Sequence, residues 1–174
     1  MIDMHKALIE TNDGIFAAHF STNGLAGLRF PDDPAASSPQ DKSQALSDWV
    51  LLTERAVRQV LEGKPVKELP PFDLSSGTDF QRSVWLAMTR IATGRTMSYG
   101  QIAEEIGSPK AVRAVGGACG ANPIPLLIPC HRVLAANRRL GGFSGGLSWK
   151  MLLLDREKVE WLPPQKKMNP IPAL

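Results

Sequence analysis

The stretch "SYGQIAEEIGSPKAVRAVGGACGAN", residues 98–122, predicts two short helices joined by a tight turn. The first helix is predicted for residues 99–106 and is closed by Gly107, because glycine favours the position just after a helix. The pair Ser108-Pro109 predicts an N-cap and first turn for a second helix that begins at Lys110. Helix, glycine turn and helix together are typical of the helix-turn-helix motif, although many packed helix pairs share this pattern.

The second of these helices is unusually rich in alanine and glycine. Val112, Val115 and Cys119 fall on one face at spacings i, i+3 and i+7, so we expect Cys119 to lie in the core. Each glycine in a helix interior costs roughly 1 kcal/mol relative to alanine, which suggests that another surface approaches the helix closely. That surface is either the rest of the protein or a nucleic-acid groove, into which Arg113 would project, and the sequence leaves both readings open.

Upstream of the helix pair, the first thirty residues predict a small antiparallel sheet. Three short runs at residues 6–11, 14–21 and 24–30 are separated by Asn-Asp-Gly and Thr-Asn-Gly, which are strong hairpin signals. Apolar residues then recur at helical spacing from Leu46 to Leu61, and Gly63 supplies a C-cap. We therefore expect this helix to cover one face of the sheet.

The chain is expected to divide into two domains and a tail. Three prolines in residues 64–77 predict a final edge strand followed by a linker. We place an N-terminal α/β domain at 1–76, a mainly α-helical domain at 77–162 and a flexible tail at 163–174. The second domain opens with a capping box, Thr78 and Gln81, and continues with one apolar stripe: Phe80, Val84, Trp85, Met88 and Ile91.

Charge is unevenly distributed along the 174 residues. Residues 80–160 carry 11 Lys and Arg against 5 Asp and Glu, whereas the remainder carries 9 against 12. Clustered positive charge favours polyanions, so the basic part is a candidate nucleic-acid-binding face, although solvated faces of this kind are common.

Two cysteines without a CxxC pair predict neither a disulfide framework nor zinc-ligand spacing, and they indicate a reducing compartment. The N-terminus lacks a signal-peptide pattern, and no apolar run approaches 18 residues. We expect a soluble protein of the cytoplasm, associated with the nucleoid, or nuclear in a eukaryote, with no role at a membrane.

Cys130 follows the apolar segment 122–129, in which three prolines predict a stiff, extended backbone. A free cysteine is most often an inert core residue, and burial would raise its pKa unless a base or a cation offsets the desolvation. His131 and Arg132 are the neighbours that could do so, His131 by reaching the sulfur around a turn or through a water. A third group should orient the imidazole, and the downstream acids are Asp155, Glu157 and Glu160.

The segment "NPIPLLIPCHRV", residues 122–133, resembles the active-site signature of the O6-alkylguanine-DNA alkyltransferase family. The resemblance extends to "MSYGQIAEEIG", "RAVGGACGAN" and "GGFSGGLSWKMLLLDRE" in the same order and spacing, and so covers residues 75–160. It implies a ribonuclease H-like N-terminal domain and a helix-turn-helix, winged-helix-like second domain. It also implies a single-turnover methylated-DNA–protein-cysteine S-methyltransferase that repairs O6-alkylguanine in duplex DNA, with O4-alkylthymine left open.

In this resemblance Cys130 accepts the alkyl group, and His131, polarised by Glu157, withdraws the thiol proton through water. Tyr99 would contact the flipped guanine and a phosphate, Ser144 would hydrogen-bond O6, and Arg113 would fill the gap in the base stack. The carbonyls of Cys130 and Val133 would read the exocyclic amino group, while Asn122 would tie the helix to the active-site strand or simply cap it. The implied substrate-binding set is Ser144, Val133, Asn122, Phe143 and Gly145. The implied DNA-binding set is Arg113, Lys110, Ala114, Gly117 and Tyr99.

The proposed chemistry also follows from the residues. A soft thiolate suits displacement at a saturated carbon, and the product is a thioether that water does not cleave, so the protein would act once. A base inside a duplex must be flipped out to be reached. We expect no cofactor, and no metal, because no cysteine precedes Cys119 whereas some relatives hold zinc in the N-terminal domain.

Two departures from the family pattern stand out. Phe143 replaces a common tyrosine, which removes a hydroxyl but keeps a ring. Residues 137–139, Asn-Arg-Arg, form a more basic loop, which either adds phosphate contacts or is solvated.

Three other functions fit parts of the sequence. A non-catalytic protein that binds alkylated DNA would share Arg113, but such proteins replace the acceptor cysteine. A Cys-His hydrolase would turn over repeatedly and ignore DNA. A plain DNA-binding regulator would carry a dimer segment, and none is evident. We therefore expect a monomer that binds duplex DNA containing O6-alkylguanine, with cooperative binding left open.

Overall fold

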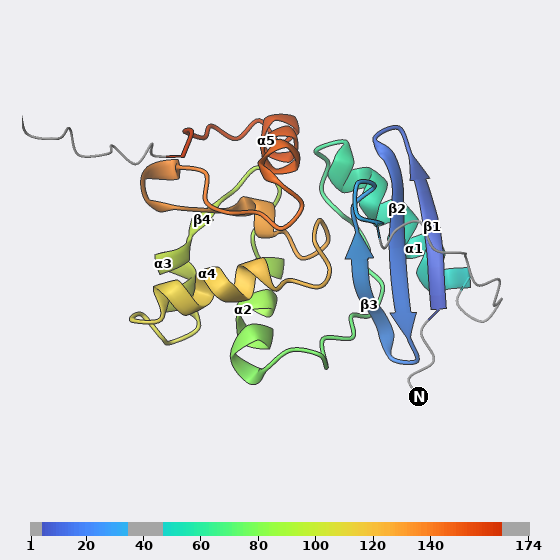
Figure 1. Ribbon diagram of the computed structural model, residues 1–174, viewed down its shortest axis with the longest axis horizontal. Helices are drawn as coiled ribbons and strands as arrows, with labels where there is room; N and C mark the ends of the chain where they lie inside the picture. The colour runs from blue at the N-terminus through green and yellow to red at the C-terminus, as the bar shows by residue number, and fades with distance from the viewer. Residues whose placement is uncertain (1–4, 35–46, 165–174) are drawn as a thin grey trace, which may run out of the picture.

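The computed structural model describes residues 5–34 and 47–164, and in Figure 1 the strands of the N-terminal sheet lie on one side and most helices on the other. Strands β1 (His5–Thr11), β2 (Gly14–Ser21) and β3 (Gly24–Arg29) form an antiparallel sheet in that order. Thr11 pairs with Gly14 and Ser21 with Gly24, so tight hairpins connect the strands. The predicted small antiparallel sheet is confirmed.

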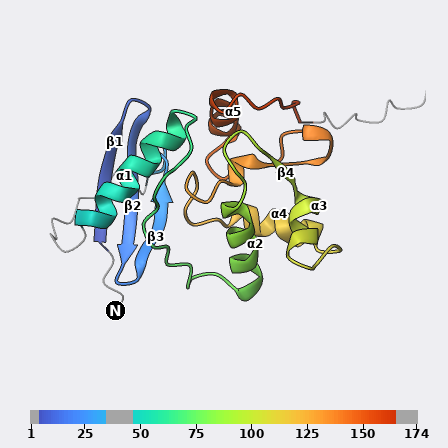
Figure 2. The ribbon, with the colours of Figure 1, turned by 180° about the vertical axis from the view of Figure 1, so that it is seen from behind.

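Helix α1 (Ser47–Leu61) lies across one face of this sheet, as Figure 2 shows. Its inward face is buried, including Ala56, Val57 and Val60, so the predicted amphipathic helix is confirmed for residues 47–61, while Leu46, where the pattern began, lies outside the described residues. Gly63 follows the helix at φ +67°, a conformation that favours glycine. A Cβ on Gly63 would lie 2.2 Å from the carbonyl oxygen of Arg156, so glycine also lets the distant C-terminal segment approach α1.

The predicted edge strand in residues 64–77 is wrong. This segment makes an isolated parallel bridge between Leu25 and Phe72, with hydrogen bonds from Leu25 N to the Pro71 carbonyl and from Asp73 N to the Leu25 carbonyl, both 2.8 Å. Pro70 and Pro71 have no N–H to donate, so a ladder cannot continue through them. The predicted division of the chain at residue 77 stays a prediction, and residues 165–174 of the predicted tail lie outside the described residues.

Four helices, α2 (Asp79–Thr89), α3 (Tyr99–Glu105), α4 (Val112–Gly120) and α5 (Leu147–Arg156), build the second part. The capping box predicted before α2 is present, because the Thr78 hydroxyl accepts from Gln81 N and the Gln81 side chain accepts from Thr78 N. Ser98 and Gln101 form a second capping box before α3, which the sequence analysis missed although its pattern is the same. These helices pack mainly through α2 with α4 and α3 with α4.

The predicted start of α4 is wrong by two residues. The N-cap is Ala111 rather than Ser108, and no side chain caps the helix. Residues 108–111 form a turn instead, closed by a 2.8 Å hydrogen bond from Ala111 N to the Ser108 carbonyl. Proline suits the second position of such a turn as well as it suits a first helical turn, so the Ser-Pro pair did not discriminate between them.

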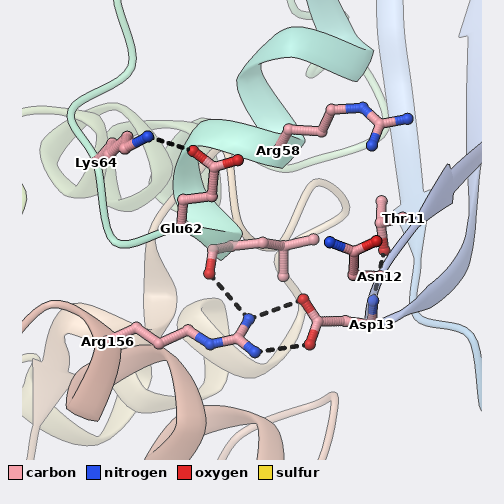
Figure 3. A pocket seen from close by; sticks show the side chains of 8 residues that line it. Thr11, Asn12, Asp13, Arg58, Glu62, Lys64 and Arg156 are labelled. Carbon is pink, nitrogen blue, oxygen red and sulfur yellow. Dashed lines mark hydrogen bonds and ion pairs between the residues drawn. The ribbon is translucent and has the colours of Figure 1, made fainter.

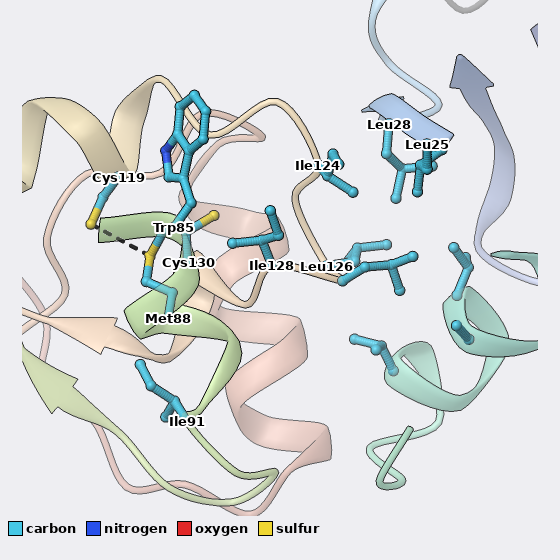
Figure 4. Close-up of a cluster of buried hydrophobic side chains, with 14 of the residues drawn as sticks. Leu25, Leu28, Trp85, Met88, Ile91, Cys119, Ile124, Leu126, Ile128 and Cys130 are labelled. Atoms are coloured by element: carbon cyan, nitrogen blue, oxygen red, sulfur yellow. Dashed lines mark hydrogen bonds between the residues drawn. The ribbon is translucent and has the colours of Figure 1, made fainter. Parts of the chain in front are cut away.

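The buried face of α4 contains Cys119 as predicted, with its sulfur 3.6 Å from the Met88 sulfur (Figure 4). Trp85 donates its indole N–H to the Ala118 carbonyl at 2.8 Å. Val112 does not belong to this face, because it is 42% exposed. It stands in the first turn, where α4 leaves the core.

Residues 122–129 are not the extended segment that their prolines suggested. Ile128 N donates to the Ile124 carbonyl, and Leu126 takes φ +72°. The resulting turn buries Ile124, Leu126 and Ile128 together, between β3 and the helices (Figure 4). One continuous hydrophobic core therefore joins the sheet to the helices and ends beside Cys130. Among the described residues there is no helix long and apolar enough to cross a membrane.

Candidate active site and nucleic-acid interface

Cys130 begins a short 3-10 helix, η3 (Cys130–Arg132), rather than a strand, and it lies at the wall of a cavity of about 620 Å³. The cavity is lined from α3, α4 and the loop before α5. Its lining includes Tyr99, Val112, Arg113, Gly116, Cys119, Gly120, Cys130, Gly141, Gly142, Phe143 and Ser144. The cavity thus brings Cys130, Tyr99, Ser144, Phe143 and Arg113 together, all of which the sequence analysis selected.

The thiol of Cys130 is protonated when the protein is at rest. Burial raises its pKa to about 11, and the Asn122 side chain and the Lys150 charge offset part of this rise. Cys130 is 5% exposed, and it lines the wall of this cavity. Transfer chemistry at this sulfur therefore requires a group that takes its proton.

His131 is fully buried and has Nε2 2.8 Å from Glu157 Oε1. Burial lowers the pKa of His131 more than Glu157 raises it, so the imidazole is neutral at pH 7. Burial alone would raise the pKa of Glu157, but hydrogen bonds and charges from His131 and Arg132 lower it to about 2. Since an ionised carboxylate only accepts, Nε2 donates, and this assignment leaves a lone pair on Nδ1. Nδ1 is the buried side-chain nitrogen without a hydrogen-bond partner in residues 5–34 and 47–164.

Arg132 pairs with Glu157, whereas the sequence analysis considered it a partner for the thiol. Its Nε lies 3.1 and 3.0 Å from the two Glu157 oxygens, and one terminal nitrogen lies 2.9 Å from Oε1. The guanidinium also donates to the Ile91 carbonyl at 2.6 Å and to the Thr93 hydroxyl at 3.0 Å. Gly94 N donates to Glu157 Oε2 at 3.0 Å, so this buried carboxylate is held on every side.

Lys150 is a fully buried cation that the sequence analysis missed. Its Nζ donates to the Val133 carbonyl at 2.6 Å and to the Gly142 carbonyl at 3.3 Å, and so joins the residue that follows η3 to the loop before α5. Burial lowers the pKa of Lys150 to about 8, although Cys130 and Cys119 act in the opposite direction. The helical spacing of Lys150, Leu153, Leu154 and Glu157 places Lys150 and Glu157 on the apolar face of α5. This spacing was the signal in the sequence from which the burial of Lys150 could have been predicted.

Arg156 fixes the end of α5 to the sheet half of the molecule (Figure 3). It donates to both carboxylate oxygens of Asp13, at 2.8 and 2.7 Å, and to the Leu61 carbonyl at 2.8 Å. The hydrogen bond from Arg156 lowers the pKa of Asp13. Because Glu157 follows Arg156 directly, the β1–β2 hairpin helps to place the carboxylate that binds His131.

Three predicted substrate-binding residues lie off the wall of this cavity. The Val133 carbonyl accepts from Lys150, and Gly145 packs against Phe30. Asn122 is buried, donates from Nδ2 to the Ile128 carbonyl at 2.8 Å and accepts from Ile124 N at 3.0 Å, so it ties the end of α4 to the segment that carries Cys130. With Ser144, it also lines a neighbouring hollow of about 320 Å³.

The outward face of α4 carries the predicted DNA-binding residues. Arg113, Ala114 and Gly117 are exposed, and Lys110 is exposed in the turn before the helix. A Cβ added at Gly116, Gly117 or Gly120 would meet no atom within 4 Å. Packing inside the protein therefore does not require these small residues, and of the two readings left open by the sequence, close approach from outside is favoured.

The basic loop at residues 137–139 is engaged within the chain. Arg138 lies 3.3 Å from Glu160, and Arg139 donates to the Pro163 carbonyl at 3.1 Å. Two short strands, β4 (Met97–Ser98) and β5 (Val133–Leu134), pair in parallel and bring Tyr99 beside the active-site segment.

Comparison with known proteins agrees with this geometry. A family model described as "6-O-methylguanine DNA methyltransferase, DNA binding domain" matches residues 79–159. A methylated-DNA–protein-cysteine methyltransferase of Methanosarcina acetivorans is 45% identical over 159 residues, which cover 88% of this chain and 98% of that protein. This chain belongs to the methylated-DNA–protein-cysteine methyltransferase family. A relative from Haemophilus influenzae is 51% identical over 86 residues, and there the chain spans about half of the relative's length, 48%.

Solved methyltransferase structures share the small antiparallel sheet as well as the helices. The structure of Mycobacterium tuberculosis OGT in complex with DNA has a TM-score of 0.74 at 36% identity, and covers 88% of this chain and 92% of that one. An O6-methylguanine DNA methyltransferase from Methanococcus jannaschii has a TM-score of 0.63 at 28% identity, and covers 95% and 99%. The alignment of this methyltransferase-family chain therefore includes both of its halves.

Proposed function

We propose that this protein repairs alkylated DNA by moving the alkyl group from O6 of guanine in a duplex to Sγ of Cys130, once per molecule. The observation that carries the proposal is a thiol at the wall of the cavity whose chain neighbour, a buried imidazole, is held by a buried carboxylate. Cys130 meets the cavity, and the neighbouring His131 is committed to Glu157 through Nε2 while Nδ1 keeps a free lone pair.

In the proposed reaction Nδ1 of His131 takes the thiol proton, directly or through one water, as Glu157 stabilises the imidazolium that forms. The thiolate attacks the saturated carbon of the alkyl group, an S–C bond forms and the C–O6 bond breaks with its electron pair on guanine. The hydroxyl of Tyr99 or Ser144 donates to the oxygen as negative charge develops there. The protein is left with a thioether, which ends its activity.

The proposed DNA-binding element is α3, the turn and α4, used as a helix-turn-helix with α4 in the minor groove. The open glycine face of α4 would let the groove come close, and the exposed Arg113 would enter the base stack. A flipped guanine would then occupy the cavity beside Cys130. The ribonuclease H-like and winged-helix-like descriptions, the monomeric state and action on O4-alkylthymine remain proposals of the same kind.

Intact-mass spectrometry after mixing the protein with one equivalent of O6-methylguanine duplex tests this function. We expect one added methyl group per chain, located at Cys130 by peptide mapping, because water does not cleave a thioether. A second equivalent of duplex should remain unrepaired. Release of more than one demethylated guanine per chain would contradict the mechanism and favour a Cys-His hydrolase or another turnover enzyme.

Replacing Arg113 with alanine should separate base flipping from chemistry. Unstacking a base costs a few kcal/mol, so loss of the residue that fills the gap should slow repair of methylated duplex at least about tenfold at saturating protein. Free O6-benzylguanine needs no flipping and should react nearly normally. The measurement is the single-turnover rate with each substrate.

Arg55→Ala is the matched control for Arg113→Ala, since Arg55 is an exposed arginine on α1 that pairs with Glu68. It should leave both rates unchanged. The opposite result would be that Arg113→Ala repairs duplex at the normal saturating rate but binds it more weakly, with the salt dependence of binding lowered by about one ion. Arg113 would then be a phosphate contact and would have no role in base flipping.

A further inference from the structure

The loop that carries Ser144, residues 141–146, is enclosed between two aromatic side chains from opposite halves of the molecule. A Cβ on Gly141 would lie 2.3 Å from the hydroxyl oxygen of Tyr99, and a Cβ on Gly145 would lie 2.4 Å from Cε2 of Phe30. Neither glycine has a positive φ. Glycine is needed at these positions because of space, not because of backbone conformation, and both contacts fix where the loop lies.

Phe30 follows β3 and leaves the sheet half of the molecule to reach this loop. Its ring centroid lies 5.7 Å from that of Phe143, at 72°, and 5.0 Å from that of Trp149. Phe16, fully buried in β2, supports the same cluster at 5.7 Å from Phe30 and 5.5 Å from Trp149. Trp149 also donates its indole N–H to Asp32 at 3.3 Å. The ring of Phe30 is therefore fixed from behind and cannot retreat.

Phe143 is the link between this cluster and the cavity, because its ring contacts Phe30 and also lines the wall near Cys130. In this chain Phe143 has no hydroxyl with which to fix itself by a hydrogen bond. Its position depends on its contact with the ring of Phe30, a buried residue that is 7% exposed. The position of the cavity wall is thus set by a residue of the N-terminal half.

We propose that Phe30 is a positioning residue that holds the Phe143–Ser144 side of the cavity against the O6 substituent and so favours small alkyl groups over large ones. The inference rests on the proposed function, in which this cavity receives an O6-alkylguanine. With Phe30 in place, Phe143 cannot move outward, so a bulky substituent competes with its ring. Without Phe30, Phe143 gains room, while Ser144 loses its fixed distance to O6.

The first test compares Phe30→Ala with the unchanged protein on duplexes that contain O6-methylguanine or O6-benzylguanine. Misplacement of a positioning group by about 1 Å can slow a reaction up to 10²-fold, so we expect methyl transfer to slow roughly tenfold. Benzyl transfer should slow less, and the ratio of benzyl to methyl rate should rise at least about threefold. Rates are measured in single turnover at saturating protein, well below the thermal midpoint.

Val57→Ala is the matched control, because Val57 is a fully buried core residue of α1, whereas the nearest atoms to Gly141 and Gly145 belong to Tyr99 and Phe30. It should lower the thermal midpoint and leave the benzyl-to-methyl ratio unchanged. If Phe30→Ala does not fold, Phe30→Leu replaces it, since leucine also lacks the Cε2 and Cζ atoms that face Gly145. The same change in ratio, of smaller size, is expected.

A double-mutant cycle with Gly145 provides an independent readout. Gly145→Ala places a methyl group against the Phe30 ring, so it should displace the loop and slow methyl transfer. In the Phe30→Ala background that methyl group has room, so Phe30→Ala/Gly145→Ala should transfer methyl faster than Gly145→Ala alone.

Each outcome of these experiments bears on one claim. Additive effects of the two substitutions, or an unchanged benzyl-to-methyl ratio in Phe30→Ala, would overturn the role of Phe30. Absence of transfer by the unchanged protein to either duplex would instead overturn the proposed function. A raised ratio together with rescue in the double variant supports the inference.

Discussion

Cys130→Ala is expected to abolish alkyl transfer completely while the protein still binds methylated duplex. No other group in the described cavity combines a soft nucleophile with an adjacent base. Cys119 also lines the cavity, but burial raises its pKa to about 12 and its sulfur lies 3.6 Å from the sulfur of Met88. Intact mass after incubation with methylated duplex should show no added methyl group, whereas a mobility-shift assay should show binding.

Cys119→Ala is the control for this prediction. It removes the second thiol from the same cavity wall, and the protein should still take up one methyl group. If the Cys130→Ala protein becomes methylated, or if the Cys119→Ala protein does not, the acceptor has been assigned to the wrong cysteine.

Glu157→Gln should slow transfer roughly 10²-fold or more, far beyond its effect on DNA binding, because a general base typically contributes at least that much. Glutamine can still accept a hydrogen bond, but it cannot stabilise an imidazolium by charge. It also leaves the buried Arg132 guanidinium without its counter-charge, which destabilises the protein by about 3–5 kcal/mol. Single-turnover rates and urea unfolding at pH 7 measure the two effects.

The stabilising effect of Glu157 should depend on pH. The pKa of Glu157 is about 2 in the folded protein against 4.5 for the free side chain, so its contribution is present above pH 4.5 and is lost as pH falls toward 2. The difference in unfolding free energy between the unchanged protein and Glu157→Gln should therefore shrink over this range.

Glu160→Gln is the matched control, since the Glu160 side chain is 89% exposed and pairs with Arg138 at the surface. It should change neither the rate nor the stability appreciably. If Glu157→Gln transfers at the normal saturating rate while its affinity for DNA collapses, Glu157 serves the structure of the helix end and not the reaction.

Local signals accounted for the elements that were predicted well. The Asn-Asp-Gly and Thr-Asn-Gly turns fixed the two hairpins, and the Thr78–Gln81 pair fixed the start of α2, since each depends on hydrogen bonds or backbone angles within four residues. Gly63 and Gly107 both adopt positive φ where a helix ends. In each case the energy that selects the conformation is local.

Local signals failed where one motif is compatible with two structures. Ser108-Pro109 fits a helix N-cap or a turn, and the structure has the turn. The prolines of residues 122–129 suggested an extended backbone, but burial of three apolar side chains between the two halves imposes a compact one. The prediction of an edge strand at residues 64–77 failed because a strand ladder needs backbone N–H donors, which Pro70 and Pro71 lack.

The sequence by itself determined the sheet hairpins, the helix pair, and the reactive Cys130-His131 pair with Glu157 as one of three candidate acids. The family resemblance pointed to Glu157 among these acids, and the tertiary structure places it beside His131. Only the tertiary structure decided that Arg132 faces this carboxylate and that Lys150 joins two carbonyls. It alone also places Phe30 against Gly145. Hydrogen bonds of turns and caps act over a few residues and leave a pattern in the sequence. These other contacts join residues 8 to 115 positions apart, and their partners become neighbours only when a common core excludes water around them.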